Sequence, residues 1–445
     1  MSTEKTQTKI LGFPWWMIAV MAVVFMILGK TDKMITNMVG ALGFALVVGS
    51  CLGWLGNHIP VWNTWLGGGT LFTSLAAGAF NTFHLLGENT VAALNTFNGG
   101  TGFLNLYILV LITGSVLSID RKMLIKSFAG YIPTILGGIV VSFLFCGIFG
   151  MIFGIGFWQS IMDFAMPIMG GGNGAGITPM SKMYAAALGL EGDAATQAAS
   201  AWWAKCFAVT SIGNLFSVIS AALLNKIGDK KPEWNGHGQL MKTEGNIGGG
   251  EDPIDKVHCG PQEYACGLAL ALFCFQIATF YGKNISLINH AGWNFSIHEF
   301  AFMVILVAIL NISGIIPVEI RAGARAIQRF FVNYMSFPLM ITVGIGASLT
   351  DYLAAFSNFG NLICMIVTVI GAMVGTFLVG KLFHFYPIEG MITAGLCMAN
   401  GGGSGDVQVL GACNRMDMMS YAQISSRIGG AIILVIASVL FGAFV

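Results

Sequence analysis

Two glycine-rich breaks interrupt apolar stretches of the chain, and their composition suits ion binding. They are Met166–Gly176 and Gly395–Gly405. Each is too short and too rich in glycine to span a bilayer as a helix, and non-helical backbone at membrane depth needs protein or a water-filled cavity beside it. A re-entrant hairpin meets that condition. Its tip would offer amides and a helix N-terminus to an anion, and carbonyl oxygens to a hard cation such as sodium. The alternative is a close helix crossing through small residues.

Of the 21 Lys and Arg residues, Arg427 lies deepest in an apolar context, with only Lys205 comparable. It sits within Tyr421–Ile433, at the head of the final expected span. An arginine inside the membrane costs at least about 2.5 kcal/mol on insertion scales, so it needs a partner or a function. Its planar guanidinium suits a carboxylate held by two hydrogen bonds, which makes Arg427 a candidate ligand for an organic anion. The alternative is a snorkelling arginine at the cytoplasmic boundary. Lys205 follows Trp202 and Trp203, which favour a snorkelling position at the interface for that residue.

Polar side chains flank both breaks. The uncharged oxygen donors, which a sodium site would use together with backbone carbonyls, are Asn173, Asn400, Ser404, Ser425 and Ser426. The carboxylates Asp163, Glu389 and Asp406 either relay protons or cap half-helices at the membrane surface. No phosphate-binding loop, nucleophile or zinc motif accompanies these residues, so the sequence predicts that the protein is not an enzyme.

The composition determines where such residues must lie. Hydrophobic residues make up 56% of the 445 positions and charged residues only 9%, against roughly 25% charged residues in a soluble domain. Most of the surface must therefore face a lipid bilayer. The net charge of +1 excludes nucleic-acid binding, which needs a basic patch.

The hydrophobic pattern predicts an all-α polytopic membrane protein with about eleven spans and two re-entrant hairpins. The expected spans are 13–29, 35–54, 67–87, 103–118, 128–157, 202–224, 263–282, 299–317, 335–350, 360–383 and 424–445. The bias of positive residues places the N-terminus and the hydrophilic loop 225–262 in the cytoplasm. We expect a tail and first span over 1–34, an N-terminal repeat over 35–224 and a C-terminal repeat over 263–445.

An internal repeat supports this division. Gly170–Gly174 recurs as Gly401–Gly405, 231 residues later, and Asp120 matches Asp351 at the same offset. Five expected crossings separate the two copies, so the repeat is inverted, with hairpins near 163–180 and 387–406. Paired glycine-broken segments in inverted repeats are the best sequence indication of a transporter binding site.

The motifs resemble the 2-hydroxycarboxylate transporter family, which includes bacterial sodium–citrate symporters and malate and citrate–lactate carriers. The resemblance covers nearly the whole chain. It is carried by Met166–Gly176, Pro387–Glu389, Ala394–Asn400, Gly402–Asp406, Ala412–Arg415, Ser420–Gly430, Leu111–Gly114 and Gly130–Leu136. It implies a homodimer in the bacterial inner membrane, with a scaffold domain and a mobile domain built around the hairpins.

The resemblance also implies a set of binding residues. Those expected to line the substrate site are Asn173, Gly174, Ser404 and Arg427, to which we add Gly402 and Gly403 of the second break. Those expected to hold sodium are Ile168, Gly171, Asn173, Cys397 and Asn400 at one site, and Ser404 and Ser426 at the other. Sodium is the coupling ion, and no other cofactor is expected.

One position departs from the family pattern. The citrate symporters have a second arginine after the asparagine that matches Asn400, whereas this chain has Gly401. A tricarboxylate would lose a charged partner worth about 1.5–3 kcal/mol. We therefore expect malate to be favoured, with citrate or lactate as alternative substrates. Because the residues that match the family's sodium ligands are retained, the resemblance implies a sodium-coupled, elevator-like transporter. Sodium-independent exchange, proton symport and an anion channel remain alternative functions.

Overall fold

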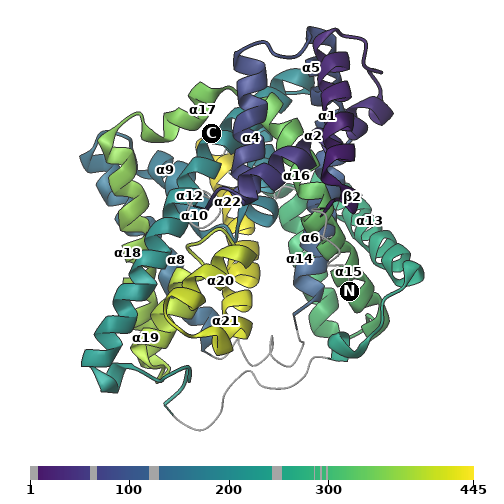
Figure 1. Ribbon diagram of the computed structural model, residues 1–445. Helices are drawn as coiled ribbons and strands as arrows, with labels where there is room; N and C mark the ends of the chain where they lie inside the picture. The colour runs from purple at the N-terminus through teal and green to yellow at the C-terminus, as the bar shows by residue number, and fades with distance from the viewer. Residues whose placement is uncertain are drawn as a thin grey trace, which may run out of the picture. The chain divides into compact units, whose positions relative to one another are not determined.

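The computed structural model describes residues 9–60, 68–119, 130–242, 253–284, 286–290, 293–296 and 299–445. Helices dominate these residues (Figure 1), as predicted, and each of the eleven expected spans overlaps a helix. Within the described ranges, seven helices are long and apolar enough to cross a membrane, or eight if the bent pair Val318–Ile345 and Leu349–Phe356 counts as one span. Trp15–Lys30 and Glu299–Ser313 are shorter apolar helices. The total of eleven spans stays a prediction.

The chain folds into two compact units that each combine segments from both sides of the central hydrophilic loop. Unit 1 comprises Met1–Tyr107, Gly189–Ala204 and Phe330–Tyr352, and unit 2 comprises Ile108–Leu188, Lys205–Arg329 and Leu353–Val445. Residues 243–252 of the central loop lie outside the described residues, as does the expected repeat anchor Asp120.

Unit 1 is a helical body held together by close contacts at small residues. Its elements are β1 (Lys9–Ile10), β2 (Phe13–Pro14), α1 (Trp15–Lys30), α2 (Met38–Asn57), α4 (Gly68–Thr82), α5 (Glu88–Asn98), the first part of α6 (Phe103–Leu117), the start of α12 (Gly192–Lys230), η5 (Phe331–Met335), α16 (Ser336–Ile345) and α17 (Leu349–Leu353). The side chain of Asn37 caps α2 by accepting a hydrogen bond from the Val39 amide at 2.9 Å. A Cβ on Gly69 would lie 2.2 Å from the carbonyl oxygen of Gly53, so α2 and α4 touch backbone to backbone.

Unit 2 contains both glycine-rich breaks and the C-terminus. Its elements are the rest of α6, α8 (Tyr131–Ile152), α9 (Phe157–Ser160), η1 (Ile161–Ala165), α10 (Met166–Met169), η2 (Asn173–Ile177), α11 (Thr178–Ala187), the rest of α12, η3 (Pro232–Trp234), η4 (Pro253–Lys256), α13 (Pro261–Asn284), β3 (Ser286–His290), β4 (Trp293–Ser296), α14 (Glu299–Ser313), α15 (Val318–Phe330), η6 (Ala354–Phe356), α18 (Phe359–Leu382), α19 (Pro387–Gly390), η7 (Met391–Leu396), α20 (Gly403–Ala412), η8 (Met416–Met418), α21 (Met419–Ile424), η9 (Ser425–Gly429) and α22 (Gly430–Phe444). The two short antiparallel strand pairs, β1–β2 and β3–β4, were not expected from the all-α prediction.

An antiparallel helix pair, α8 and α18, forms the frame of unit 2. Gly130, before α8, lies against Phe383, after α18, and Phe153, after α8, lies against Gly360 near the start of α18. Midway along the pair, a Cβ on Gly375 would meet the Gly137 carbonyl oxygen at 2.2 Å. Small residues therefore let the two helices approach closely along their length. After each helix, a short helical segment leads into one of the glycine-rich breaks.

Candidate substrate and ion site

The first glycine break is the tip of a helical hairpin, which we call hairpin 1. Its first arm runs through α9, η1 and α10, and its second arm through η2 and α11. The chain turns at Gly171 and Gly172, whose φ angles are +76° and +109°. Only glycine adopts such angles without strain, which explains why this sequence can turn so tightly.

The second glycine break is the tip of another helical hairpin, hairpin 2. Its first arm is α19 and η7, and its second arm is α20, which begins at Gly403. Gly402 turns the chain with φ +73°. The amide end of a helix thus begins directly after each turn, where the helix dipole favours negative charge.

The two tips touch each other. A Cβ on Gly172 would lie 2.6 Å from the carbonyl oxygen of Gly401, and a Cβ on Gly402 would lie 2.6 Å from that of Gly171. Gly171 and Gly402 are related by the repeat offset of 231 residues. Residues that matched only by register in the sequence therefore meet in the structure.

The bases of the two hairpins lie at opposite ends of α8. Phe157, at the start of hairpin 1, packs against Gly147 near the end of α8. Phe385, just before hairpin 2, lies 6.3 Å from Tyr131 at the start of α8, measured between ring centroids. Tyr131 and Gly147 are 16 positions apart on α8, and a helix rises about 1.5 Å per residue, so the two bases contact α8 at points about 24 Å apart.

A π-helical segment, η9, presents Ser426 and Arg427 beside these tips. A Cβ on Gly171 would lie 2.2 Å from the Ser426 carbonyl oxygen. A small cavity of about 30 Å³ is lined by Gly171, Ser426, Arg427 and Ser115 among others. The Arg427 guanidinium donates a hydrogen bond to the Ser118 hydroxyl. Further π-helical turns (η1, η2 and η7) occur in the hairpin arms, and such turns are frequent at functional sites.

A buried polar network connects hairpin 2 to η9. Asn400 Nδ2 donates to one oxygen of Asp406 at 3.0 Å, and Ser426 Oγ donates to the other at 2.9 Å. Asn400 Oδ1 accepts from the Gly402 amide at 2.8 Å and so braces the turn. Asn173 Oδ1, on hairpin 1, is buried and finds no hydrogen-bond partner among the described residues. A buried acceptor without a donor is costly, and a cation or a substrate hydroxyl would satisfy it.

The other predicted site residues lie on the same two hairpins. Ile168 is buried on α10 and faces Gly213 of α12, and Cys397 is buried directly after η7. Gly174 lies in the first turn of η2, and Gly403 begins α20. Ser404 lies in the first turn of α20, and its side chain is not among those that the structure describes. The structure thus brings the predicted set together around the two tips and η9.

The three carboxylates near the breaks do not cap helices at the surface, which corrects one of the two expectations. Asp163, Glu389 and Asp406 are 4%, 0% and 0% exposed. Lys205 does not snorkel freely, because its ammonium forms an ion pair with Asp163 at 2.6 Å and lies over the Phe164 ring. The local sequence could not reveal this, since Asp163 and Lys205 are 42 residues apart.

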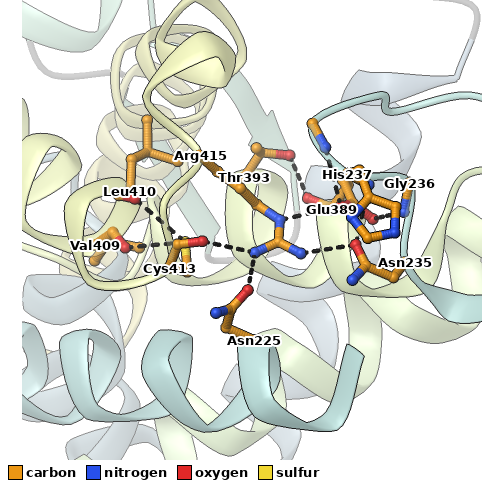
Figure 2. Close-up of polar contacts among 11 residues, drawn as sticks. Asn225, Asn235, Gly236, His237, Glu389, Thr393, Val409, Leu410, Cys413 and Arg415 are labelled. Carbon is orange, nitrogen blue, oxygen red and sulfur yellow. Dashed lines mark hydrogen bonds and ion pairs between the residues drawn. The ribbon is translucent and has the colours of Figure 1, made fainter. Parts of the chain in front are cut away.

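The sequence missed two features of the site. Arg415 is buried at 4% exposure, more deeply than the half-buried Arg427, so Arg427 is not the most enclosed arginine. Its guanidinium pairs with Glu389, as Figure 2 shows. Ser115 and Ser118 also contribute to the surroundings of Arg427. The motif Leu111–Gly114 directly precedes these serines and was the signal that pointed to this helix.

A multi-span helical protein with two glycine-tipped hairpins that meet beside a polar cluster and an arginine has the features of a membrane transporter. The chain belongs to the 2-hydroxycarboxylate transporter family, whose model matches residues 10–439, and this confirms the resemblance seen in the sequence. It is not an enzyme.

Individual relatives are similar over nearly their full length. The citrate/sodium symporter of Salmonella typhimurium is 40% identical over 449 residues, which cover 100% of this chain and 97% of that protein. The citrate transporter CitP of Lactococcus lactis is 34% identical, with 95% of this chain and 91% of that protein covered. The malate transporter MleP of Lactococcus lactis is 31% identical, with 98% and 99% covered.

Proposed function

We propose that this protein is a sodium-coupled secondary transporter of small 2-hydroxycarboxylates. The observation that carries the proposal is the meeting of the two hairpin tips at Gly172 and Gly402, beside Ser426 and Arg427, in a chain of this family. Helix amide ends and a guanidinium together suit an organic anion, and the adjacent amide and hydroxyl oxygens suit sodium.

Arg427 is the main charged ligand for the substrate in this proposal. Its guanidinium can hold one carboxylate by two hydrogen bonds, in exchange for the bond that it donates to Ser118. Backbone amides at the two tips would bind the remaining polar groups. The full substrate set is Asn173, Gly174, Gly402, Gly403, Ser404 and Arg427.

Sodium is assigned to the oxygen atoms around the tips. The buried, unpartnered Asn173 Oδ1 supports this assignment, because hard cations take amide and carbonyl oxygens as ligands. The proposed sites are formed by Ile168, Gly171, Asn173, Cys397 and Asn400, and by Ser404 and Ser426. In the second site, Ser426 already donates a hydrogen bond to the buried Asp406 carboxyl group, which adds further oxygen atoms beside the proposed ligands.

Transport requires the site to change shape. A cavity of about 30 Å³ holds little more than one water molecule, so a dicarboxylate needs an opened conformation. The hairpin bases at opposite ends of α8 suit an inverted repeat whose tips are exposed to either side in turn. We propose an elevator-like movement of this kind, in a homodimer in the bacterial inner membrane.

Two observations bear on the preferred substrate, and they favour different ones. Gly401 supplies no charge for a third carboxylate and favours a dicarboxylate such as malate. Whole-chain identity is higher to the citrate/sodium symporter, at 40%, than to the malate transporter, at 31%. We propose malate, because burying the third carboxylate of citrate without a charged partner is costly.

The test is uptake into liposomes that contain the purified protein. Malate, citrate and lactate are each supplied with and without an inward sodium gradient. We expect saturable malate uptake that the sodium gradient drives. Uptake driven equally well by a proton gradient or by internal substrate would replace sodium symport with one of the alternatives, and non-saturable flux would indicate a channel.

Variants of Arg427 test the substrate site in the same assay. Arg427→Lys keeps the charge but loses the two-pronged geometry, so the half-saturating malate concentration should rise. Arg427→Ala should remove nearly all transport, because the dianion would enter the site without its main positive partner. Wild-type uptake by Arg427→Ala would exclude this residue from the site.

A further inference from the structure

The base of hairpin 2 holds a second buried arginine that lies away from the tips. Arg415 lies three residues after the end of α20, and Glu389 lies in the first turn of the opposite arm, on α19. Arg415 Nε donates to Glu389 Oε1 at 3.0 Å (Figure 2). The pair therefore joins the two arms of hairpin 2 where they enter and leave the protein body.

The same guanidinium also binds two other parts of the chain. Nη1 donates to Asn225 Oδ1 of α12 at 2.6 Å and to the Cys413 carbonyl oxygen at 2.8 Å. Nη2 donates to Asn235 Oδ1 at 2.9 Å. One side chain thus connects α12, the residues after it and both arms of the hairpin (Figure 2).

Glu389 completes the connection to the residues that follow α12. Its Oε2 accepts from the Gly236 amide at 2.8 Å, and its Oε1 also accepts from the Gly238 amide at 3.4 Å. We call the segment Asn235–Lys242 the strap. Its far end forms an antiparallel bridge between Met241 and Phe385, and the Tyr386 amide donates to the Leu240 carbonyl oxygen at 2.9 Å.

This network is poorly suited to adding stability alone. A buried ion pair gains little net free energy over apolar residues of the same size, because both charges must be desolvated. Its specific property is geometric, since the bonds of one planar guanidinium fix several segments at defined angles. First-arm residues 387–396 form a nearly continuous helix, so a change of angle at the base is transmitted to the tip about 15 Å away.

We propose that Glu389 and Arg415 are positioning residues for transport. They hold hairpin 2 against α12 and the strap, and thereby keep the Asn400–Gly403 tip in the geometry that binds substrate and sodium. This inference rests on the proposed function of the tips. Neither residue is assigned a contact with substrate, and Asn225 and Asn235 serve the same pair as neutral acceptors.

Two conservative substitutions remove some hydrogen bonds of the network but keep side chains of similar size. Arg415→Lys keeps the charge but replaces three donor nitrogens by one, so it cannot reach Glu389, Asn225 and Asn235 together. Glu389→Gln keeps the shape but accepts hydrogen bonds at one oxygen only, so either Arg415 or the Gly236 amide loses its partner. Lys242→Gln is the matched control, because it removes a strap charge whose ammonium lies over the Tyr386 ring, outside the pair.

The first measurement is uptake by the full-length protein in liposomes, with malate or citrate and sodium varied in turn. Both test variants should raise the half-saturating concentrations of substrate and sodium about tenfold or more, with a smaller change in maximal rate. Lys242→Gln should match the wild type. An equal fall in maximal rate with unchanged half-saturation would overturn the proposal. Absence of uptake by the wild type would instead contradict the proposed function.

The second measurement does not depend on transport. A Cβ on Gly401 meets no atom within 4 Å, so Gly401→Cys places a reporter thiol at the tip without a clash. Its maleimide reaction rate, read by peptide mass spectrometry, should change when Arg415→Lys or Glu389→Gln is added and stay the same with Lys242→Gln. Equal rates in all backgrounds would overturn the proposal. Loss of folded protein in both test variants but not in the control would indicate a purely structural pair and would overturn it as well.

Discussion

Hairpin 1 is fastened halfway along its first arm, whereas hairpin 2 is fastened at its base. In hairpin 1, Asp163 of η1 pairs with Lys205 of α12, and the lysine side chain is 25% exposed. In hairpin 2, Glu389 and Arg415 are 0% and 4% exposed. A partly exposed lysine can reorient at lower cost than a fully buried arginine that is hydrogen-bonded on several sides. The comparison indicates that the two hairpins have similar tips but differ in how firmly their arms are anchored.

The tips differ in the space around equivalent glycines. A Cβ on Gly170 would meet Met180 Cε at 2.6 Å and the Met166 carbonyl oxygen at 2.9 Å, whereas its repeat partner Gly401 has open space. Gly171 and Gly402 are both tightly enclosed with positive φ angles. Gly402 is therefore enclosed by the opposite tip, and Gly171 is enclosed by Ser426 and Gly430, while Gly401 has room for a side chain. A side chain can therefore be introduced at position 401 without loss of the contact between the hairpins.

The largest effect is expected at the enclosed tip glycines. Gly402→Ala places a Cβ 2.6 Å from the Gly171 carbonyl oxygen at φ +73°, and Gly171→Ala places one 2.2 Å from the Ser426 carbonyl oxygen. Gly402→Ala should separate the tips, Gly171→Ala should push hairpin 1 away from η9, and both should remove nearly all uptake. Gly401→Ala is the control and should transport as the wild type does. Normal uptake by Gly402→Ala would show that the tip contact is not needed.

The next prediction compares how much each of the two ion pairs contributes to the free energy of unfolding. Arg415→Ala leaves Glu389 buried without its charged partner and should lower the free energy of unfolding by about 3–5 kcal/mol. Lys205→Ala should cost less, roughly 1.5–3 kcal/mol, because Gln159 still donates to Asp163 at 2.7 Å. Thermal unfolding of the detergent-solubilised variants measures the difference. Equal losses of stability would contradict the distinction between the fully buried and the partly exposed ion pair.

A third, smaller effect concerns substrate choice. Gly401→Arg should shift the ratio of citrate to malate uptake about tenfold toward citrate, because roughly 1.4 kcal/mol of added interaction suffices. Gly401 is not among the glycines with positive φ, and its surroundings are open, so the arginine should be tolerated. Residual malate uptake is the control for folding. An unchanged ratio in a folded protein would remove the reason to prefer a dicarboxylate.

The success of the sequence predictions follows from how local each signal is. Apolar runs and glycine breaks are properties of short windows, so helix positions and both tips could be predicted. The pairing of Glu389 with Arg415 joins residues 26 positions apart, and the Asn225 contact spans 190 positions. Arg415 also lies between the polar residues Asn414 and Asp417, which conceal its burial in a local reading. When a distant segment such as the strap buries a residue, the neighbouring residues in the sequence do not reveal that burial.

The last prediction leaves transport unchanged and tests the orientation of the hairpins. The base of hairpin 2 contacts the strap, which is part of the central loop. If that loop is cytoplasmic, the base of hairpin 2 must be cytoplasmic too. The base of hairpin 1 lies near the other end of α8 and should then be accessible from outside the cell. Leu188, after hairpin 1, and Met416, after hairpin 2, are 41% and 47% exposed, so cysteines there should not disturb packing.

Intact cells that carry Leu188→Cys or Met416→Cys are treated with a membrane-impermeant maleimide, and the modified peptides are read by mass spectrometry. The thiol introduced at position 188 should react in intact cells, and the one at position 416 only after the membrane is made permeable. Both variants must retain wild-type uptake, so that the labelled protein is the functional one. Gly171 and Gly402 are unsuitable positions for a cysteine, because a side chain there would clash with η9 or with the opposite tip. Reaction of both thiols from the same side would mean that the hairpins enter from one face, and the inverted relation between them would have to be abandoned.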